Sequence, residues 1–254
     1  MPTIIPIPAF ADNYIWLLRE GDTAAVVDPG DATPVIAYLE REDIALTAIV
    51  ATHHHGDHVG GIRALLARGD VPVYGPANEA IPGRTHALGE GDAIVVPGIG
   101  LALSVLDIPG HTAGHIALAG EGMVFCGDTL FAAGCGRLFE GTPVQMVASL
   151  AKLSGLRDAT RIYCGHEYTL SNLRFALAVE PGSAALLERQ VRAQAARAQG
   201  APTLPTMIAE ERATNPFLRV HEASIRGAVE RHAGRALDGP AGVFAELRAW
   251  KNSF

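Results

Sequence analysis

A short segment in the first quarter of the chain carries side chains that could bind metal ions. Thr52-His53-His54-His55-Gly56-Asp57-His58 contains the pattern His-x-His-x-Asp-His and directly follows the apolar run Ala48–Ala51. Residues two apart face the same way on an extended chain, so His53 and His55 can converge, and Asp57 and His58 follow where a helix begins. Imidazole and carboxylate groups suit zinc, iron or manganese. The segment offers two pairs of ligands, which fits two adjacent ions better than one.

Three further candidate ligands follow apolar runs later in the chain. They are His111 in Ile-Pro-Gly-His, Asp128 in Cys-Gly-Asp and His166 in Cys-Gly-His. Each comes directly after a glycine, which permits a tight turn. Because a carboxylate has two oxygen atoms, Asp128 can bridge two ions. Each ion would then have four protein ligands, and a water or hydroxide between the ions would complete the site.

The elements that must position these side chains are short. Apolar or alternating runs predict strands at 4–8, 14–18, 24–28, 47–52, 71–74, 101–107, 115–119, 123–126 and 161–164. Helices are predicted at 33–41, 58–68 and 142–154, the last opened by Thr142 and Pro143. Strands mixed with helices, without a regular strand–helix–strand rhythm, predict packed sheets with helices on the outside.

The amino-acid composition of the chain changes after Glu167. Residues 183–199 are rich in strong helix formers. Further helices are predicted at 206–212, 221–232 and 242–251, and prolines separate them. We therefore predict two domains, one at 1–167 that carries the candidate ligands and a helical one at 168–254.

Composition excludes several classes of protein. The chain has 254 residues, of which 48% are hydrophobic and 19% charged, as in ordinary globular proteins. Its net charge of −7 argues against general nucleic-acid binding. No apolar run reaches the roughly 20 residues of a membrane span, and the N-terminus lacks the pattern of a secretory signal. Three cysteines cannot form a disulfide framework, so we expect a cytoplasmic protein.

These blocks resemble the metallo-β-lactamase superfamily. Within it, the segments Cys126–Thr142 and Tyr163–Thr169 and the helical tail closely resemble glyoxalase II, the hydroxyacylglutathione hydrolases. The similarity extends over essentially the whole chain, although the His-x-His-x-Asp-His motif alone is specific only to the superfamily. The resemblance implies an αββα sandwich with a C-terminal all-helical domain.

The resemblance also assigns the ligands. It implies one metal held by His53, His55 and His111, a second held by Asp57, His58 and His166, and Asp128 bridging the two. His54 and His115 match positions that do not bind metal. The implied cofactor is a pair of divalent ions, with zinc preferred and iron and manganese as alternatives.

Enzymes of this family hold the glutathione part of S-D-lactoylglutathione, which carries two carboxylates. The matching positions here are Arg137, Phe139, Tyr168, Arg248 and Lys251. Arg248 and Lys251 are three residues apart and so share one helix face. Phe139 stands where some relatives have tyrosine, so its hydroxyl hydrogen bond is missing, which affects substrate affinity rather than the chemistry.

The implied activity is hydrolysis of S-D-lactoylglutathione to D-lactate and glutathione, the second step of methylglyoxal detoxification. Two ions would lower the pKa of a water from about 15.7 towards 7, and Asp57 and Asp128 would orient that nucleophile. Thiolate is a good leaving group, so neither a strong acid nor a protein nucleophile is required. We expect a monomer whose partner is the small glutathione thioester, without nucleic-acid or membrane partners.

Three other interpretations share part of this pattern. A persulfide dioxygenase with one iron, or a lactonase, could have the same fold and the same first motif. The helical tail with Arg248 and Lys251 favours the glutathione thioesterase. The third interpretation, a non-catalytic scaffold stabilised by metal, needs a closed site, whereas seven ligands over two open sites argue against it.

Overall fold

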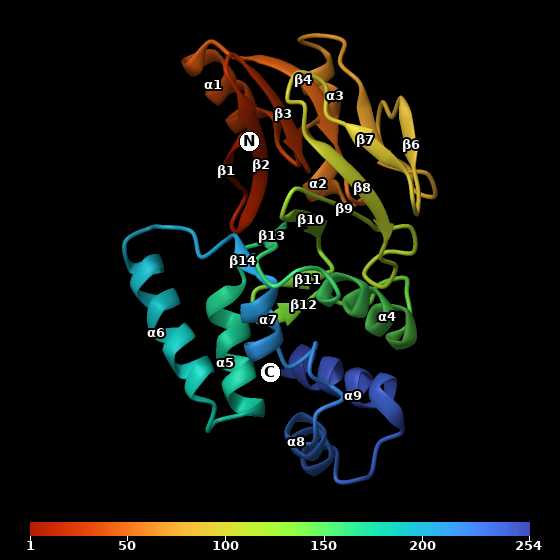
Figure 1. Ribbon diagram of the computed structural model, residues 1–254, viewed down its shortest axis with the longest axis vertical. Helices are drawn as coiled ribbons and strands as arrows, with labels where there is room; N and C mark the ends of the chain where they lie inside the picture. Colours follow the sequence, from red (N-terminus) through yellow and green to blue (C-terminus); the bar gives the residue numbers. More distant parts are fainter.

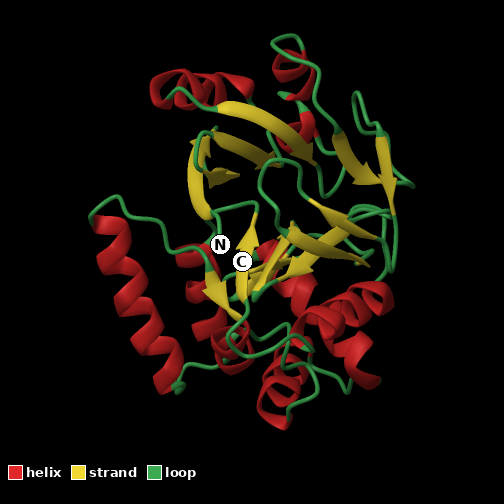
Figure 2. Ribbon diagram, turned by 45° about the horizontal axis from the view of Figure 1, so that its top comes forward, coloured by secondary structure: helices red, strands yellow, loops and turns green.

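The computed structural model describes residues 1–254 and shows two six-stranded sheets with helices outside them (Figures 1 and 2). The first sheet has the strand order β1-β2-β3-β4-β5-β6. Its strands are β1 (Thr3–Ala9), β2 (Asn13–Glu20), β3 (Thr23–Val27), β4 (Ala45–Val50), β5 (Val73–Pro76) and β6 (His86–Leu88). The first three strands are antiparallel, and β3 to β6 are parallel.

The second sheet has the order β14-β13-β10-β9-β8-β7. Its strands are β7 (Ala93–Val95), β8 (Ala102–Asp107), β9 (Ile116–Gly120), β10 (Met123–Gly127), β13 (Arg161–Cys164) and β14 (Thr206–Met207). Only the β10–β13 pair is parallel. A separate small hairpin consists of β11 (Leu130–Phe131) and β12 (Gly134–Cys135).

Nine helices cover the sheets and form the C-terminal region. They are α1 (Ala32–Glu42), α2 (Gly56–Val59), α3 (Ile62–Leu66), α4 (Pro143–Ser154), α5 (Thr169–Val179), α6 (Ala184–Ala198), α7 (Ile208–Thr214), α8 (Ala223–Ala233) and α9 (Gly239–Ser253). The predicted start of α4 is confirmed: Thr142 caps the helix in a capping box with Gln145, and Pro143 occupies the first turn. None of the helices combines the length and apolar composition that a membrane crossing needs.

The predicted αββα sandwich with a helical C-terminal region is confirmed, with local differences. The helix expected at 58–68 is two short helices, α2 and α3, interrupted at Gly60-Gly61, because glycine is a poor helix former. The helix expected at 206–212 begins instead with strand β14, which pairs with β13. Helix α5 was not predicted. The division at residue 167 stays a prediction.

One apolar core lies between the two sheets and continues into the C-terminal helices. Trp16 and Val50 of the first sheet belong to the same buried cluster as Phe125 of the second, and so do Phe175 of α5 and Phe244 of α9. A second cluster fills the space between the outer face of the first sheet and helices α1 and α3. The C-terminal helices are therefore packed onto the second sheet and share its core.

A buried ion pair ties this helical region to the β11–β12 hairpin. Arg189 Nη2 of α6 lies 2.5 Å from Glu211 Oε1 of α7 and also donates to Thr206 Oγ1 at 2.9 Å. The other carboxylate oxygen, Oε2 of Glu211, accepts a hydrogen bond from the backbone N–H of Ala133, in the hairpin turn, at 2.8 Å. Both charged side chains are buried. Removal of either partner would leave the other charge buried without compensation.

We expect Arg189→Met to lower the free energy of unfolding by about 3–5 kcal/mol, because it leaves Glu211 buried and unpaired. Arg192→Met is the matched control on the same helix, since Arg192 pairs with Glu210 at the surface, and it should cost less than about 1 kcal/mol. Chemical denaturation of both variants makes the comparison. Equal costs would contradict the role given to the buried pair.

Candidate metal centre

Six of the seven predicted ligands form two clusters in the structure. The ligand atoms of the first triad (His53, His55, His111) all lie within 4.8 Å of one another, and so do those of the second triad (Asp57, His58, His166). Every one of these residues lies beyond the carboxyl end of a strand: after β4, in α2, after β8 or after β13. Strand ends of both sheets therefore bring residues far apart in sequence to one place.

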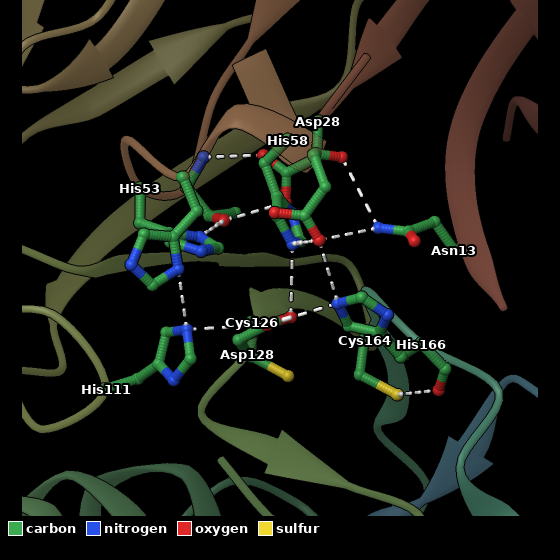
Figure 3. Close-up of polar contacts among 12 residues, drawn as sticks. Asn13, Asp28, His53, His58, His111, Cys126, Asp128, Cys164 and His166 are labelled. Atoms are coloured by element: carbon green, nitrogen blue, oxygen red, sulfur yellow. Dashed lines mark hydrogen bonds and ion pairs between the residues drawn. The ribbon is translucent and has the colours of Figure 1, made fainter. Parts of the chain in front are cut away.

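Asp128, directly after β10, lies between the two triads (Figure 3). Its Oδ1 is 3.3 Å from Nε2 of His58, and its Oδ2 is 3.4 Å from Nε2 of His111 and 3.2 Å from Nε2 of His166. Both oxygen atoms thus face ligand atoms, and the two triads share this carboxylate. The bridging role of Asp128 stays a prediction.

Buried polar atoms without a partner show that the centre fits metal ions. Nε2 of His53, Nε2 of His58 and Oδ1 of Asp128 are buried and form no hydrogen bond, although the last two atoms face each other at 3.3 Å. Such an atom costs about 1–3 kcal/mol when it is left unsatisfied. All three belong to predicted ligands and are grouped at one point. Nitrogen and carboxylate oxygen donors of this kind suit divalent transition-metal ions.

The charges in the centre differ from residue to residue. Burial, followed by the nearby ring of His58, lowers the pKa of His53 well below its usual value, so this imidazole is neutral, the form that binds a cation. Burial alone would raise the pKa of Asp128. The charge of His58 and the hydrogen bond with His166 outweigh that effect and hold the pKa well below its ordinary range. Asp128 is therefore ionised at neutral pH.

Residues around the ligands hold them in place, and sequence reasoning missed the most important of these, Asp28. Its Oδ2 lies 3.1 Å from Nδ1 of His58, and its carboxylate accepts hydrogen bonds from both the N–H and the hydroxyl of Thr52 at 2.7 Å. Asp28 has a left-handed backbone, with φ of 54°. An aspartate at a strand end before Pro-Gly was the available signal, but it is equally typical of an ordinary turn.

The two histidines expected not to bind metal have other contacts. Burial lowers the pKa of His115 to about 3, and its neutral Nε2 accepts a hydrogen bond from the backbone N–H of Asp128 at 3.1 Å. The two ring nitrogens of His54 lie 3.0 Å from Glu79 Oε2 and 3.4 Å from Glu140 Oε1. Both histidines therefore support neighbouring loops.

A cavity of about 700 Å³ opens beside the centre. Its lining includes His55, Asp57, His111, Asp128 and His166 from the centre, together with all five predicted substrate-binding residues, Arg137, Phe139, Tyr168, Arg248 and Lys251. Residues of the β11–β12 hairpin and of helices α5 and α9 complete the wall. The structure thus places the predicted binding residues in one space with the candidate ligands.

The polar contacts of the cationic residues leave their charges facing this cavity. Arg248 Nη1 donates to the carbonyl oxygen of Cys135 at 2.9 Å, and Lys251 Nζ donates to that of Ser171 at 3.1 Å. These acceptors are neutral. Burial, followed by the charge of Arg248, lowers the pKa of Lys251 to about 8. Neither cation is paired with a carboxylate, so both remain available to an anionic ligand.

Two aromatic rings line the cavity and contact candidate ligands. The Tyr168 ring stacks on that of His166, with the ring centroids 4.7 Å apart. Phe139 packs edge to face against His55 and His111, with centroids 5.6 and 5.2 Å apart, and it is exposed at the cavity. Phe139 thus offers an apolar surface beside the first triad.

Comparison with known proteins agrees with this geometry. The family model of the metallo-beta-lactamase superfamily matches residues 10–166, and that of the hydroxyacylglutathione hydrolase C-terminus matches residues 167–254. The fold and the site together define a member of the metallo-β-lactamase superfamily. Over essentially full length the chain is 60% identical to a hydroxyacylglutathione hydrolase of Alkalilimnicola ehrlichii (99% of each chain) and 52% identical to one of Nitrosomonas europaea (100% of this chain, 97% of the relative). The chain belongs to the hydroxyacylglutathione hydrolase family, which confirms the predicted family.

Solved structures show the same fold at lower identity. ETHE1 from Myxococcus xanthus superposes with a TM-score of 0.66 at 25% identity, covering 100% of this chain and 99% of its own. TTHA1623 in a di-iron-bound form gives a TM-score of 0.61 at 27% identity, covering 84% of this chain and 100% of its own.

The tight approach of Gly127 to the centre gives a test of this architecture. Gly127 has φ of +45°, and a Cβ there would lie 2.2 Å from Thr52 Oγ1 and 2.8 Å from the His115 ring. We expect Gly127→Ala to lower both the melting temperature and the metal content, since overpacking of about 1–3 kcal/mol adds to the backbone strain. Gly100→Ala is the matched control, because Gly100 also has positive φ but open space around it. The interpretation fails if the two variants melt alike with equal metal content.

Proposed function

We propose that the chain hydrolyses the thioester S-D-lactoylglutathione to D-lactate and glutathione. The observation that carries this proposal is the cavity that joins the two candidate triads to Arg137, Arg248 and Lys251. A glutathione thioester has an acyl group that must reach the centre and two carboxylates that require cations. The cavity offers both surfaces in a single space.

We propose that two divalent cations occupy the centre, zinc by preference, with iron or manganese as alternatives. The ligands would be His53, His55 and His111 for one cation and Asp57, His58 and His166 for the other, with Asp128 shared between them. Bound there, such cations would lower the pKa of a water molecule and polarise a carbonyl group.

The side chains of the centre then orient the reactants. Asp57 and Asp128 are the carboxylates that border both the centre and the cavity, so they are placed to accept hydrogen bonds from the attacking water. The leaving thiol has an ordinary pKa of about 8.5, so it departs as thiolate without a strong proton donor. The buried Cys135 has a pKa raised to about 11 by its burial, which argues against a nucleophilic role.

The far end of the cavity would bind glutathione. Arg137, Arg248 and Lys251 are suited to its carboxylates, and charge-assisted hydrogen bonds of this type are the strong ones. Burial, followed by the charges of Asp12 and Asp128, raises the pKa of Tyr168, so its hydroxyl stays protonated and can donate a hydrogen bond. Phe139 would contact the substrate through its apolar face alone.

We also propose that the protein works in the cytoplasm as a monomer. All three cysteines are free and buried, which supports work in a reducing compartment, the cytoplasm. The cavity and both triads are formed by residues of one chain, which supports a monomer as the working unit.

Loss of a second-triad ligand tests the metal scheme. His58→Ala should reduce the bound cations from two to one and lower turnover by about a hundredfold or more, since electrostatic stabilisation of the reaction is lost. Metal analysis and the ultraviolet absorbance of the thioester measure both effects on one sample. His86→Gln is the control, because His86 stacks on Tyr74. Wild-type turnover in His58→Ala would contradict the scheme, and strict dependence on oxygen in the wild type would favour the dioxygenase.

The lowered pKa of Lys251 predicts a pH dependence of substrate capture. As pH rises through about 8, Lys251 loses its proton and its attraction for a carboxylate, so kcat/KM should fall by about ten- to a hundredfold. Lys251→Arg should remove this fall, because arginine stays charged. Steady-state kinetics between about pH 7 and 9 give the profile. A fall that persists in Lys251→Arg would assign the titration to another group.

A further inference from the structure

The turn between β1 and β2 of the first sheet is hydrogen-bonded to the segment that follows β13 of the second sheet. The backbone N–H of Tyr14 donates to the carbonyl oxygen of Gly165, and that of Glu167 donates to the carbonyl oxygen of Asp12, both at 2.8 Å. Asn13 forms an isolated antiparallel bridge with His166. The turn is therefore attached to the segment that carries a ligand of the second triad.

Asp12 fixes the ring of His166. Its Oδ1 lies 2.8 Å from Nδ1 of that ring. Because a carboxylate only accepts hydrogen bonds, the proton of a neutral His166 must be on Nδ1. The other nitrogen, Nε2, then carries a free lone pair, and it faces Asp57 Oδ2 at 3.4 Å and Asp128 Oδ2 at 3.2 Å. This hydrogen bond sets both the tautomer and the direction of the ring.

Asn13 fixes the carboxylate of Asp57. Its Nδ2 donates to Oδ2 of Asp57 at 3.0 Å, and the asparagine is buried. The same oxygen lies 3.6 Å from Nε2 of His58 and 3.4 Å from Nε2 of His166. A neutral donor thus holds the oxygen that faces the other members of the second triad.

The neighbouring loop fits closely against this turn. A Cβ at Gly30 would lie 1.8 Å from the carbonyl oxygen of Asp57 and 3.0 Å from Phe10 Cε2. Phe10 itself has a left-handed backbone with φ of 50°. The loop at Gly30 is therefore packed tightly against both Asp57 and the turn.

The first triad has different supports. Nδ1 of His53 lies 3.1 Å from Thr52 Oγ1, and Nδ1 of His111 lies 2.9 Å from the carbonyl oxygen of Arg137. These partners come from the end of β4 and from the loop after β12. Thr52 also donates to Asp28, which faces His58, but the side-chain hydrogen bonds of Asp12 and Asn13 go only to residues of the second triad.

We propose that Asp12 and Asn13 are positioning residues that set the cation affinity of the second triad independently of the first. The inference rests on the proposed two-cation centre. The turn between β1 and β2 acts on one cation only. Substitutions in this turn therefore change the affinity of one cation site and leave that of the other unchanged.

The test compares Asp12→Ala, Asp12→Asn and Glu140→Gln with the wild type. Zinc dissociation constants are measured by competition with a chromophoric chelator. Asp12→Ala should raise one of the two constants about ten- to a hundredfold and leave the other unchanged. The weakened constant of Asp12→Asn should lie between those of the wild type and Asp12→Ala, because its amide oxygen still accepts a hydrogen bond from Nδ1 of His166 but carries no negative charge. Glu140→Gln is the control: its carboxylate is as exposed as that of Asp12, 39% against 38%, and it contacts His54.

A cobalt spectrum identifies the triad that is weakened. At limiting cobalt(II), Asp12→Ala should show the visible absorption of His58→Ala, in which the second triad is broken. Two unchanged zinc constants in Asp12→Ala would overturn this inference and leave the proposed function intact. A wild-type chain that binds fewer than two cations would overturn both. Equal weakening of both constants, or the same loss in Glu140→Gln, would show a general effect on the fold and overturn the independence of the two sites.

Discussion

The structure depends on holding unpaired polar atoms inside a protein core. Nε2 of His53, Nε2 of His58 and Oδ1 of Asp128 are buried together without hydrogen bonds, at a cost that is a sizeable part of the stability of an ordinary domain. Two stacked sheets offset this cost because their strands end at one edge and place the ligands on short connections. Asp28 and His115 then hold ligand residues through hydrogen bonds of their own. The strands, the short turns and the hydrogen bonds from surrounding residues therefore all hold the candidate ligands in position.

The ligands could be predicted from the sequence because their signals are local. The His-x-His-x-Asp-His motif follows a strand directly, and His111, Asp128 and His166 each come after a strand and a glycine. A residue at the end of a strand has a nearly fixed position, so the type of residue and its place along the chain were enough. Arg248 and Lys251 were chosen from the resemblance to the family, and helical spacing added only that they share one face.

The supporting residues could not be predicted in this way. Asp12, Asn13 and Asp28 are residue types that turns favour for their own backbone reasons, and their roles depend on partners 154, 44 and 30 positions away. The pairing of strands likewise depends on residues far apart in sequence, so a two-residue strand such as β14 could not be predicted from its own residues. The interruption between α2 and α3 was visible as Gly60-Gly61, but the apolar spacing around it favoured one continuous helix.

The position of α9 has a consequence for synthesis of the protein. Arg248 reaches back from this last helix to the carbonyl oxygen of Cys135, and the side chains of α9 form one wall of the cavity. The candidate ligands all lie at or before His166, so a nascent chain leaving the ribosome exposes the whole ligand set well before that wall exists. The part of the cavity that α9 provides, with Arg248 and Lys251, is therefore the last to be completed.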